Sequence, residues 1–344
     1  MYKIKVFVNM NKNLRQRLIC FFEISQRTSL ILLIFLFFNA CQDEFTNESD
    51  IESISVSISF DRFDLKFYDQ PSEVIPELKK KYPFLFPKQF SDSVWISRQK
   101  DSLQLLLQSE VNKTFKDIEL FERDVDHLFK HIKYFFPFAK TPRVITLTNN
   151  VDYQIKTVYS DSLLLISLDT FLGSENHLYD GIPTYIRKEL DPKYITVQIA
   201  DKFGAFIIPP VEDRTFLARM IYEGKKLYLN DLLLPHVPIE DRIVYTKEEF
   251  NWALENEKYV WQYFIEKQVL YQTQLEWVQR FIEPAPFSKF YLQLDNETPG
   301  RIGSWLGWQI VNSYMIQFPE TPLDELLKIS PQKLFNLSKY KPKR

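Results

Sequence analysis

Apolar and polar positions alternate strictly from Ile54 to Phe60. Ile54, Val56, Ile58 and Phe60 fall on one side of the segment, and serines fall on the other. A period of two is typical of a half-buried β-strand. The pattern therefore predicts a strand at residues 54–60, which runs into the polar motif FDRFD at residues 60–64.

Beyond this segment the period changes. Between residues 91 and 134, apolar positions recur at three- and four-residue steps, which predicts two helices, the second ending before Pro137. Three runs rich in β-formers follow at residues 143–148, 154–160 and 162–172. These runs predict a small antiparallel sheet in the N-terminal half.

From residue 191 onward the pattern is helical almost to the end. It predicts helices at residues 192–203, 213–222 and 299–316, and a helical stretch at 247–282 that is long enough for two helices. Thr246 and Glu249 form a capping box at the start of that stretch. The expected fold class is α+β, mostly helical.

The first forty residues differ from the rest. They contain six basic residues and one acid, followed by the apolar run LILLIFLFF at residues 30–38. Nine residues are too few to cross a bilayer, which needs about 20, so the segment is typical of a signal peptide. It ends in FFNAC, where Cys41 resembles the lipidated cysteine of bacterial lipoproteins. An ordinary signal peptide with an incidental cysteine remains the alternative.

Cleavage before Cys41 would leave one cysteine, so the mature chain could form no internal disulfide. Bacterial lipoproteins carry several acyl chains, and more than one chain is needed for stable anchoring. We therefore expect a signal peptide at residues 1–40, a polar tether at 41–50 and a single domain at 51–344. The membrane, reached through lipidated Cys41, is the first predicted partner.

Charge and composition narrow the possible functions. Without residues 1–40 the chain has a net charge of −7, which gives no electrostatic case for nucleic-acid binding. Hydrophobic residues make up 45% of the chain and aromatic residues 16%, enough for a large core without disulfides.

Three of the seven glycines fall in the segment PGRIGSWLGWQ, at Gly300, Gly303 and Gly307. Thr298 and Pro299 predict a helix start here, and the three glycines would then share one helical face. Each interior glycine costs about 1 kcal/mol relative to alanine, so a close approach to the backbone is expected. A packed helix is the simpler interpretation, and a ligand groove is the alternative.

This segment, with MIYEGKKLYLNDLLLP (220–235), FDRFD, HIKYFFPF (131–138) and APFSKF (285–290), resembles the GldB family, gliding motility lipoproteins of Bacteroidetes. The resemblance covers nearly the whole chain. It implies an envelope protein, anchored in the outer membrane, that serves gliding motility and its associated secretion machinery. Other envelope proteins of that machinery are the implied partners, and no known reaction is implied.

The family is in turn distantly similar to zinc-peptidase-like domains, a class with a His-Glu-x-x-His helix and an outlying Glu ligand. The corresponding helix here, at residues 193–203, contains no histidine, and only Glu223 could correspond to the outlying Glu ligand. The resemblance thus implies a zincin-like scaffold that has lost its metal site.

Other residues are weaker candidates for a metal-binding or catalytic site. His127 and His131 have the i, i+4 spacing that can bind zinc, but Leu128 stands where a general-base glutamate belongs, and Asp124 is the nearest candidate third ligand. Asp61 and Asp64 flank Arg62 and favour a structural ion pair. We expect no catalytic residue, no cofactor and no bound metal.

The expected role is a non-enzymatic accessory of the gliding or secretion apparatus. One alternative is an envelope enzyme related to metallopeptidases with an altered site. Stoichiometric zinc that is lost when His127 or Glu223 is changed would favour this alternative. A second alternative is a periplasmic binding module that uses a groove beside the Gly300–Gly307 face.

Overall fold

The structure is a computed structural model that describes residues 48–342. The chain divides into two units, Met1–Ile51 and Glu52–Arg344. Of the first unit only residues 48–51 are described, at the start of α2 (Glu48–Ser53). The predicted signal peptide, Cys41 and most of the predicted tether lie outside the described residues. The sheet and all helices after α2 belong to the second unit.

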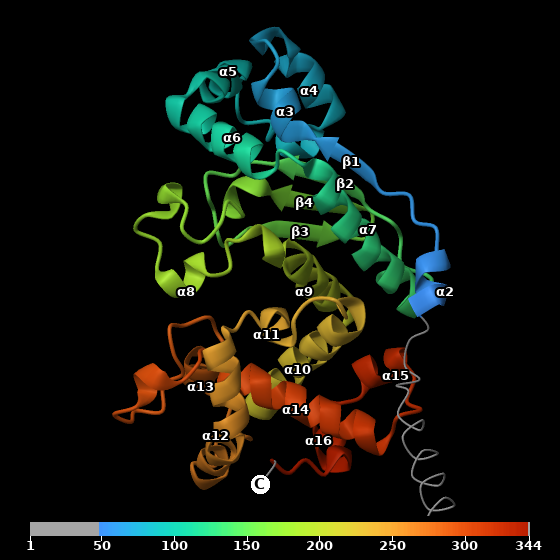
Figure 1. Cartoon of the computed structure of the whole chain (residues 1–344), viewed down its shortest axis with the longest axis vertical. Helices are drawn as coiled ribbons and strands as arrows, with labels where there is room; N and C mark the ends of the chain where they lie inside the picture. Colours follow the sequence, from blue (N-terminus) through green and yellow to red (C-terminus); the bar gives the residue numbers. More distant parts are fainter. Residues whose placement is uncertain (1–47, 343–344) are drawn as a thin grey trace, which may run out of the picture. The chain divides into compact units, whose positions relative to one another are not determined.

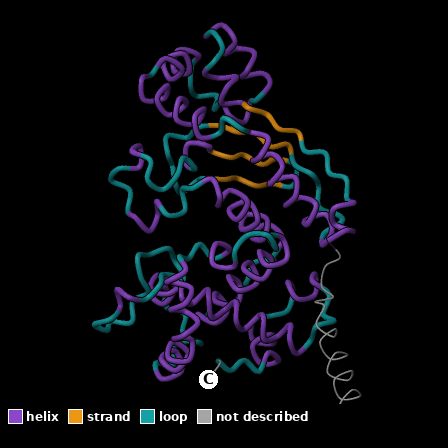
Figure 2. The backbone as a smooth tube through the Cα atoms, in the orientation of Figure 1, coloured by secondary structure: helices purple, strands orange, loops and turns teal. Residues whose placement is uncertain are grey.

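The sheet lies in the sequence region where it was predicted, but its strands pair differently. Its order is β1-β2-β4-β3 (Figure 2). The strands are β1 (Ser59–Arg62), β2 (Arg143–Leu147), β3 (Thr157–Ser160) and β4 (Leu163–Ser167). β1 and β4 both run parallel to β2, and only β3 and β4 are antiparallel.

The α+β class is confirmed, whereas the wholly antiparallel sheet is wrong. The chain travels from β1 to β2 through a long helical crossover, the kind of connection that parallel strands require. Only the turn at Asp161 and Ser162 is short enough to join its two strands as a hairpin. The predicted strand at 54–60 is also shorter than expected, because residues 54–58 are extended but do not pair, although their exposure alternates as predicted.

Helices cover both faces of the sheet, so alternate residues of β2 enter different cores. Ile145 packs in one core with phenylalanines of α3 (Phe63–Tyr68) and with Ile75 and Leu78 of α4 (Ile75–Lys81). Val144 packs in the core formed with α7 (Ile118–Phe135) and α9 (Ile195–Ile207). Figure 1 shows α3 to α6 beside β1 at one side of the sheet and α9 beside β3 at the other. The predicted helical region at 91–134 is α5 (Asp92–Lys100), α6 (Ser102–Thr114) and α7.

A second helical core forms the C-terminal part. Its helices are α10 (Phe216–Leu233), α12 (Lys247–Glu266), α13 (Leu275–Phe281), α14 (Ile302–Gln317), α15 (Leu323–Lys328) and α16 (Pro331–Ser338), and two short helices, α8 (Thr184–Arg187) and α11 (Ile239–Arg242), precede α12. The capping box of Thr246 and Glu249 is confirmed. The predicted end of a helix at Tyr222 is wrong, because α10 continues through Gly224 to Leu233.

Within residues 48–342, no helix has both the length and the apolar character needed to cross a bilayer.

Candidate functional site

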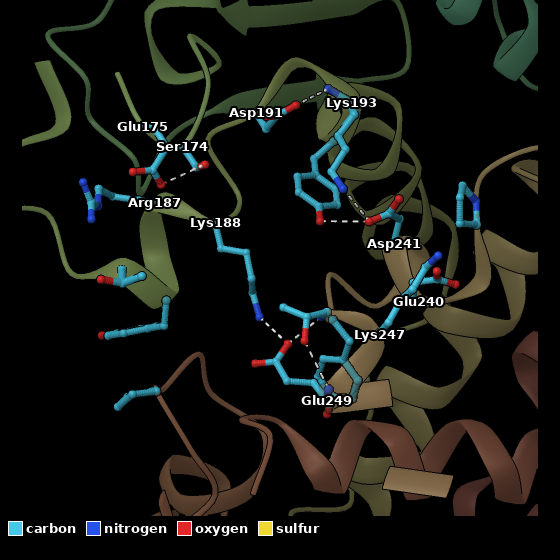
Figure 3. A pocket seen from close by; sticks show the side chains of 17 residues that line it. Ser174, Glu175, Arg187, Lys188, Asp191, Lys193, Glu240, Asp241, Lys247 and Glu249 are labelled. Carbon is cyan, nitrogen blue, oxygen red and sulfur yellow. Dashed lines mark hydrogen bonds and ion pairs between the residues drawn. The ribbon is translucent and has the colours of Figure 1, made fainter. Parts of the chain in front are cut away.

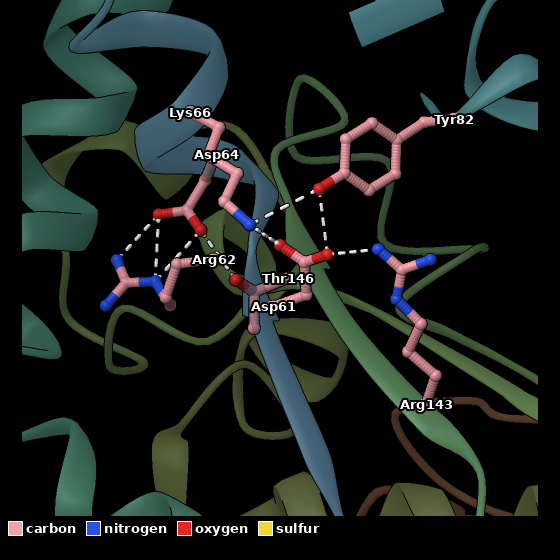
Figure 4. Close-up of polar contacts among 7 residues, drawn as sticks. All are labelled: Asp61, Arg62, Asp64, Lys66, Tyr82, Arg143 and Thr146. Atoms are coloured by element: carbon pink, nitrogen blue, oxygen red, sulfur yellow. Dashed lines mark hydrogen bonds and ion pairs between the residues drawn. The ribbon is translucent and has the colours of Figure 1, made fainter. Parts of the chain in front are cut away.

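The FDRFD motif forms a network of buried charges at the start of β2 (Figure 4). The Asp61 carboxylate accepts hydrogen bonds from Tyr82 Oη at 2.8 Å, from Lys66 Nζ and from Arg143. Burial alone would raise the pKa of Asp61, but these three hydrogen bonds together hold it below its ordinary value. Asp61 is therefore ionised and paired.

Asp64 is fully buried within the same network. Its carboxylate accepts from Arg62 Nη2 at 2.6 Å, from Gln108 Nε2 at 3.0 Å and from Thr146 Oγ1. The donors around the two aspartates thus join β1, α3 and β2 to α6 and to Tyr82. This arrangement stabilises the fold, as a structural ion pair would, and leaves no carboxylate poised for proton transfer.

The glycines mark places where backbone meets backbone. A Cβ atom on Gly307 would lie 1.8 Å from the Met220 carbonyl oxygen, and one on Gly224 would lie 2.2 Å from the Gly307 carbonyl. Real Cβ atoms do not approach that closely, so α10 and α14 can cross only because both positions are glycine. This crossing fills the space beside both glycines.

Gly300 and Gly303 also face carbonyl oxygens, but they do not share a helical face with one another. The predicted helix start is wrong: α14 begins at Ile302 after Arg301, whose φ of 57° is left-handed, so Gly300 lies outside it. A Cβ on Gly300 would come within 2.3 Å of the Ala285 oxygen, and the Gly300 carbonyl accepts from Tyr245 Oη at 2.6 Å. Tertiary hydrogen bonds thus replace the first helical turn.

A cleft of about 800 Å³ lies between the segment around α8 and the segment around α11 (Figure 3). Charged side chains of both signs line it, and several are paired: Lys188 Nζ lies 2.7 Å from Glu249 Oε2, and Lys193 Nζ lies 2.8 Å from Asp241 Oδ1. The buried Nε–H of Arg187 has no hydrogen-bond acceptor among the described residues. The tyrosines of this cleft are Tyr185, Tyr194 and Tyr245.

A second cleft of about 550 Å³ lies over α9 and α10. One face of α10 lines it, with Arg219, Tyr222, Glu223, Lys226 and Asn230 at helical spacing. A small pocket shares lining residues with both clefts, Lys188 and Glu249 with the first and Glu189 and Arg301 with the second. The small pocket therefore lies between the two clefts, and we call the three together the long cleft.

Lys226 lies between two carboxylates in the long cleft. Its Nζ is 2.8 Å from Asp201 Oδ1 on α9 and 3.0 Å from Glu223 Oε2 on α10. Burial alone would lower the pKa of Lys226, but the charges of the two carboxylates outweigh it and raise the pKa above its ordinary value. A fixed ammonium group therefore occupies the cation position between these helices. Glu223 is already engaged with it, which fits poorly with a metal ligand.

The structure adds a third histidine to His127 and His131. The rings of these two residues, one turn apart on α7, are 4.6 Å apart between centroids. His236, in the loop between α10 and α11, lies 4.8 Å from His127 and 6.4 Å from His131. Sequence reasoning missed His236 because the fold alone brings this loop to α7. Asp124, the expected neighbour, is exposed on α7, and the carboxylate of Glu52 lies 3.1 Å from His127 Nε2.

Fold and site together define an α+β protein with a charged cleft and a dense helical core. A family model described as "Gliding motility protein GldB" matches residues 44–342, and the chain belongs to this family of gliding motility lipoproteins of the cell envelope. No curated protein and no solved structure matches the chain.

Proposed function

We propose that this chain is an outer-membrane lipoprotein, held by acyl chains on Cys41, that acts in gliding motility and its secretion machinery as a non-enzymatic accessory. The long cleft is the surface with which it binds an envelope partner. Membership of the family supports the link to gliding, and the sequence FFNAC supports the anchor.

The observation that carries the non-enzymatic role is the position of Lys226. A metallopeptidase needs an exchangeable metal ion with an open coordination position between its two helices. Here a lysine ammonium, only 12% exposed, is paired with both carboxylates that face this position. A water-activating ion would have to compete with this ammonium group for the carboxylates, and Gln198, not a histidine, is the neighbouring lining residue on α9.

A second candidate, a ligand-binding module, is favoured by the volume of the long cleft and by its borders. Arg301 and Ser304, at the start of α14, line it next to the glycine-rich segment. A small-molecule ligand would then replace the envelope partner in the same cleft.

Two variants test the proposal in gliding cells. Cys41→Ala should release the protein from the membrane and abolish gliding. Glu223→Gln should leave membrane attachment intact, and the purified full chain should hydrolyse no peptide. Persistent membrane attachment of Cys41→Ala would contradict the anchor, and peptide turnover that is lost in Glu223→Gln would contradict the non-enzymatic role.

A further inference from the structure

We infer that His127, His131 and His236 bind one divalent transition-metal ion, with zinc as the expected occupant, and that this ion ties α7 to the loop that follows α10. Three of the four histidines in the chain meet at this one place. None of the three lines the long cleft. The inference therefore goes beyond the proposed function: an ion held here would be structural, so zinc that depends on His127 and not on Glu223 would not by itself speak for an enzyme.

The ring separations suit a shared ion. Nitrogen atoms that share a tetrahedral zinc at about 2.0–2.1 Å lie about 3.4 Å from one another. Centroid separations of 4.6, 4.8 and 6.4 Å bring the three rings to one place, and side-chain rotation is required to bring one nitrogen of each to that spacing. Imidazole is a common ligand for zinc, copper and nickel, so the chemistry selects this class of metal over magnesium or calcium.

His131 is held in a suitable orientation. It is fully buried, and its Nδ1–H donates to the His127 carbonyl oxygen at 3.0 Å. In the neutral ring the lone pair is then on Nε2. A backbone hydrogen bond of this kind commonly fixes the tautomer and the ring direction of metal-bound histidines.

The loop that carries His236 is hydrogen-bonded at two carbonyl groups to the guanidinium group of Arg242. Arg242 Nη2 donates to the Pro235 carbonyl at 2.8 Å, and Arg242 Nε donates to the Val237 carbonyl at 2.9 Å, so the residues on both sides of His236 are fixed. Arg242 is in turn paired with Asp231 at 2.9 Å. A histidine placed on such a supported loop needs little further ordering when it binds an ion.

A carboxylate completes the surroundings of the site. Glu52 Oε1 lies 3.1 Å from His127 Nε2, and Glu52 Oε2 lies 2.8 Å from Lys130 Nζ. The negative charge of Glu52 favours a cation here and orients His127. His127 is half-buried and His236 is exposed, so an ion can enter from solvent.

The test uses the full chain, purified in detergent without a polyhistidine tag and titrated with zinc in a calorimeter. We expect one zinc ion per chain and at least tenfold weaker binding in His236→Gln, whose exposed side chain can change without loss of the fold. His177→Gln, which alters the one histidine outside the cluster, is the matched control and should bind like the parent. Lack of saturable binding, or equal weakening in both variants, would overturn the inference.

Two further measurements locate the ion. Cobalt(II) bound to the parent chain should give the intense visible absorption of a four-coordinate site, and His236→Gln should lose it. Glu223→Gln should bind zinc like the parent. Zinc that is lost in Glu223→Gln and kept in His236→Gln would overturn this inference and would place the ion in the long cleft instead, whereas the proposed function is tested separately by gliding and peptide turnover.

Discussion

The two faces of α10 do different work. On one face Met220 and Gly224 meet Gly307 of α14 at backbone contact, and the two tryptophans of α14 are buried in the same core. On the other face Arg219, Tyr222 and Lys226 line the long cleft. One face of the helix is thus closely packed against another helix, and the opposite face is charged and open to solvent.

The two faces of α10 therefore contribute to different properties, the packed face to stability and the cleft face to binding. The glycine crossing fixes where α14 can lie, because no side chain fits between the helices. The cleft face needs only a rigid support for its side chains, and the crossing supplies that support. Changes on the packed face should therefore cost folding free energy, and changes on the cleft face should alter binding at little structural cost.

The largest effect is expected for Gly307→Ala, because its Cβ would lie 1.8 Å from a backbone oxygen that cannot move alone. We expect a loss of roughly 4 kcal/mol or more in the free energy of unfolding, beyond ordinary overpacking. The matched control is Gly204→Ala on α9, whose Cβ would lie 3.4 Å from Lys226 Cγ, an ordinary van der Waals contact. Urea denaturation should show that Gly204→Ala is as stable as the parent or slightly more stable. Equal losses of stability in both variants would contradict the special role of the Gly307 contact.

The next effect concerns Lys225, the neighbour of Lys226 on the packed side of α10. Its Nζ donates to the carbonyls of Leu327 and Ile329 at 2.9 and 2.7 Å, and burial lowers its pKa to about 8. Since the unfolded chain holds this proton more tightly, stability should rise with pH between about 8 and 10.5, by on the order of 3 kcal/mol.

Lys225→Met should lack this rise. The measurement is the free energy of unfolding of both proteins from pH 7 to 10.5. Parallel curves would show that Lys225 does not enter the core as a charged group.

A smaller effect is expected for Lys226→Met, which leaves Asp201 and Glu223 facing each other without a cation. The carboxylates are partly exposed, so we expect a loss of about 2 kcal/mol at pH 7. Lys226→Arg should retain most of the stability. Thermal unfolding of both variants at pH 7 checks this, and equal losses in Lys226→Met and Lys226→Arg would argue against the charge triad.

The fold was predictable wherever one pattern decides the local structure. The capping box at Thr246, the apolar face of α7 and the close contact at Gly307 follow from side-chain chemistry within a few residues. The parallel pairing of β1 with β2 could not be predicted in this way, because strand order depends on how the whole helical crossover packs.

The site was less predictable, because it depends on residues distant in sequence. The sequence points to Glu223, but the pairing of Lys226 with both Glu223 and Asp201 appears only when α9 lies against α10. The sequence around His236 contains no metal-ligand motif, and only folding brings His236 close to His127. The start of α14 was misjudged because Thr298 and Pro299 form tertiary contacts in place of a helix cap.

The most direct test of the central claim changes the cleft face alone. Arg219 is exposed, lines the long cleft and is expected to contribute within about 0.5 kcal/mol to stability. Gliding should be lost in cells that carry Arg219→Glu and retained with Lys333→Glu, an exposed charge reversal on α16, at equal protein levels. Normal gliding with Arg219→Glu would contradict the assignment of the long cleft as the working surface.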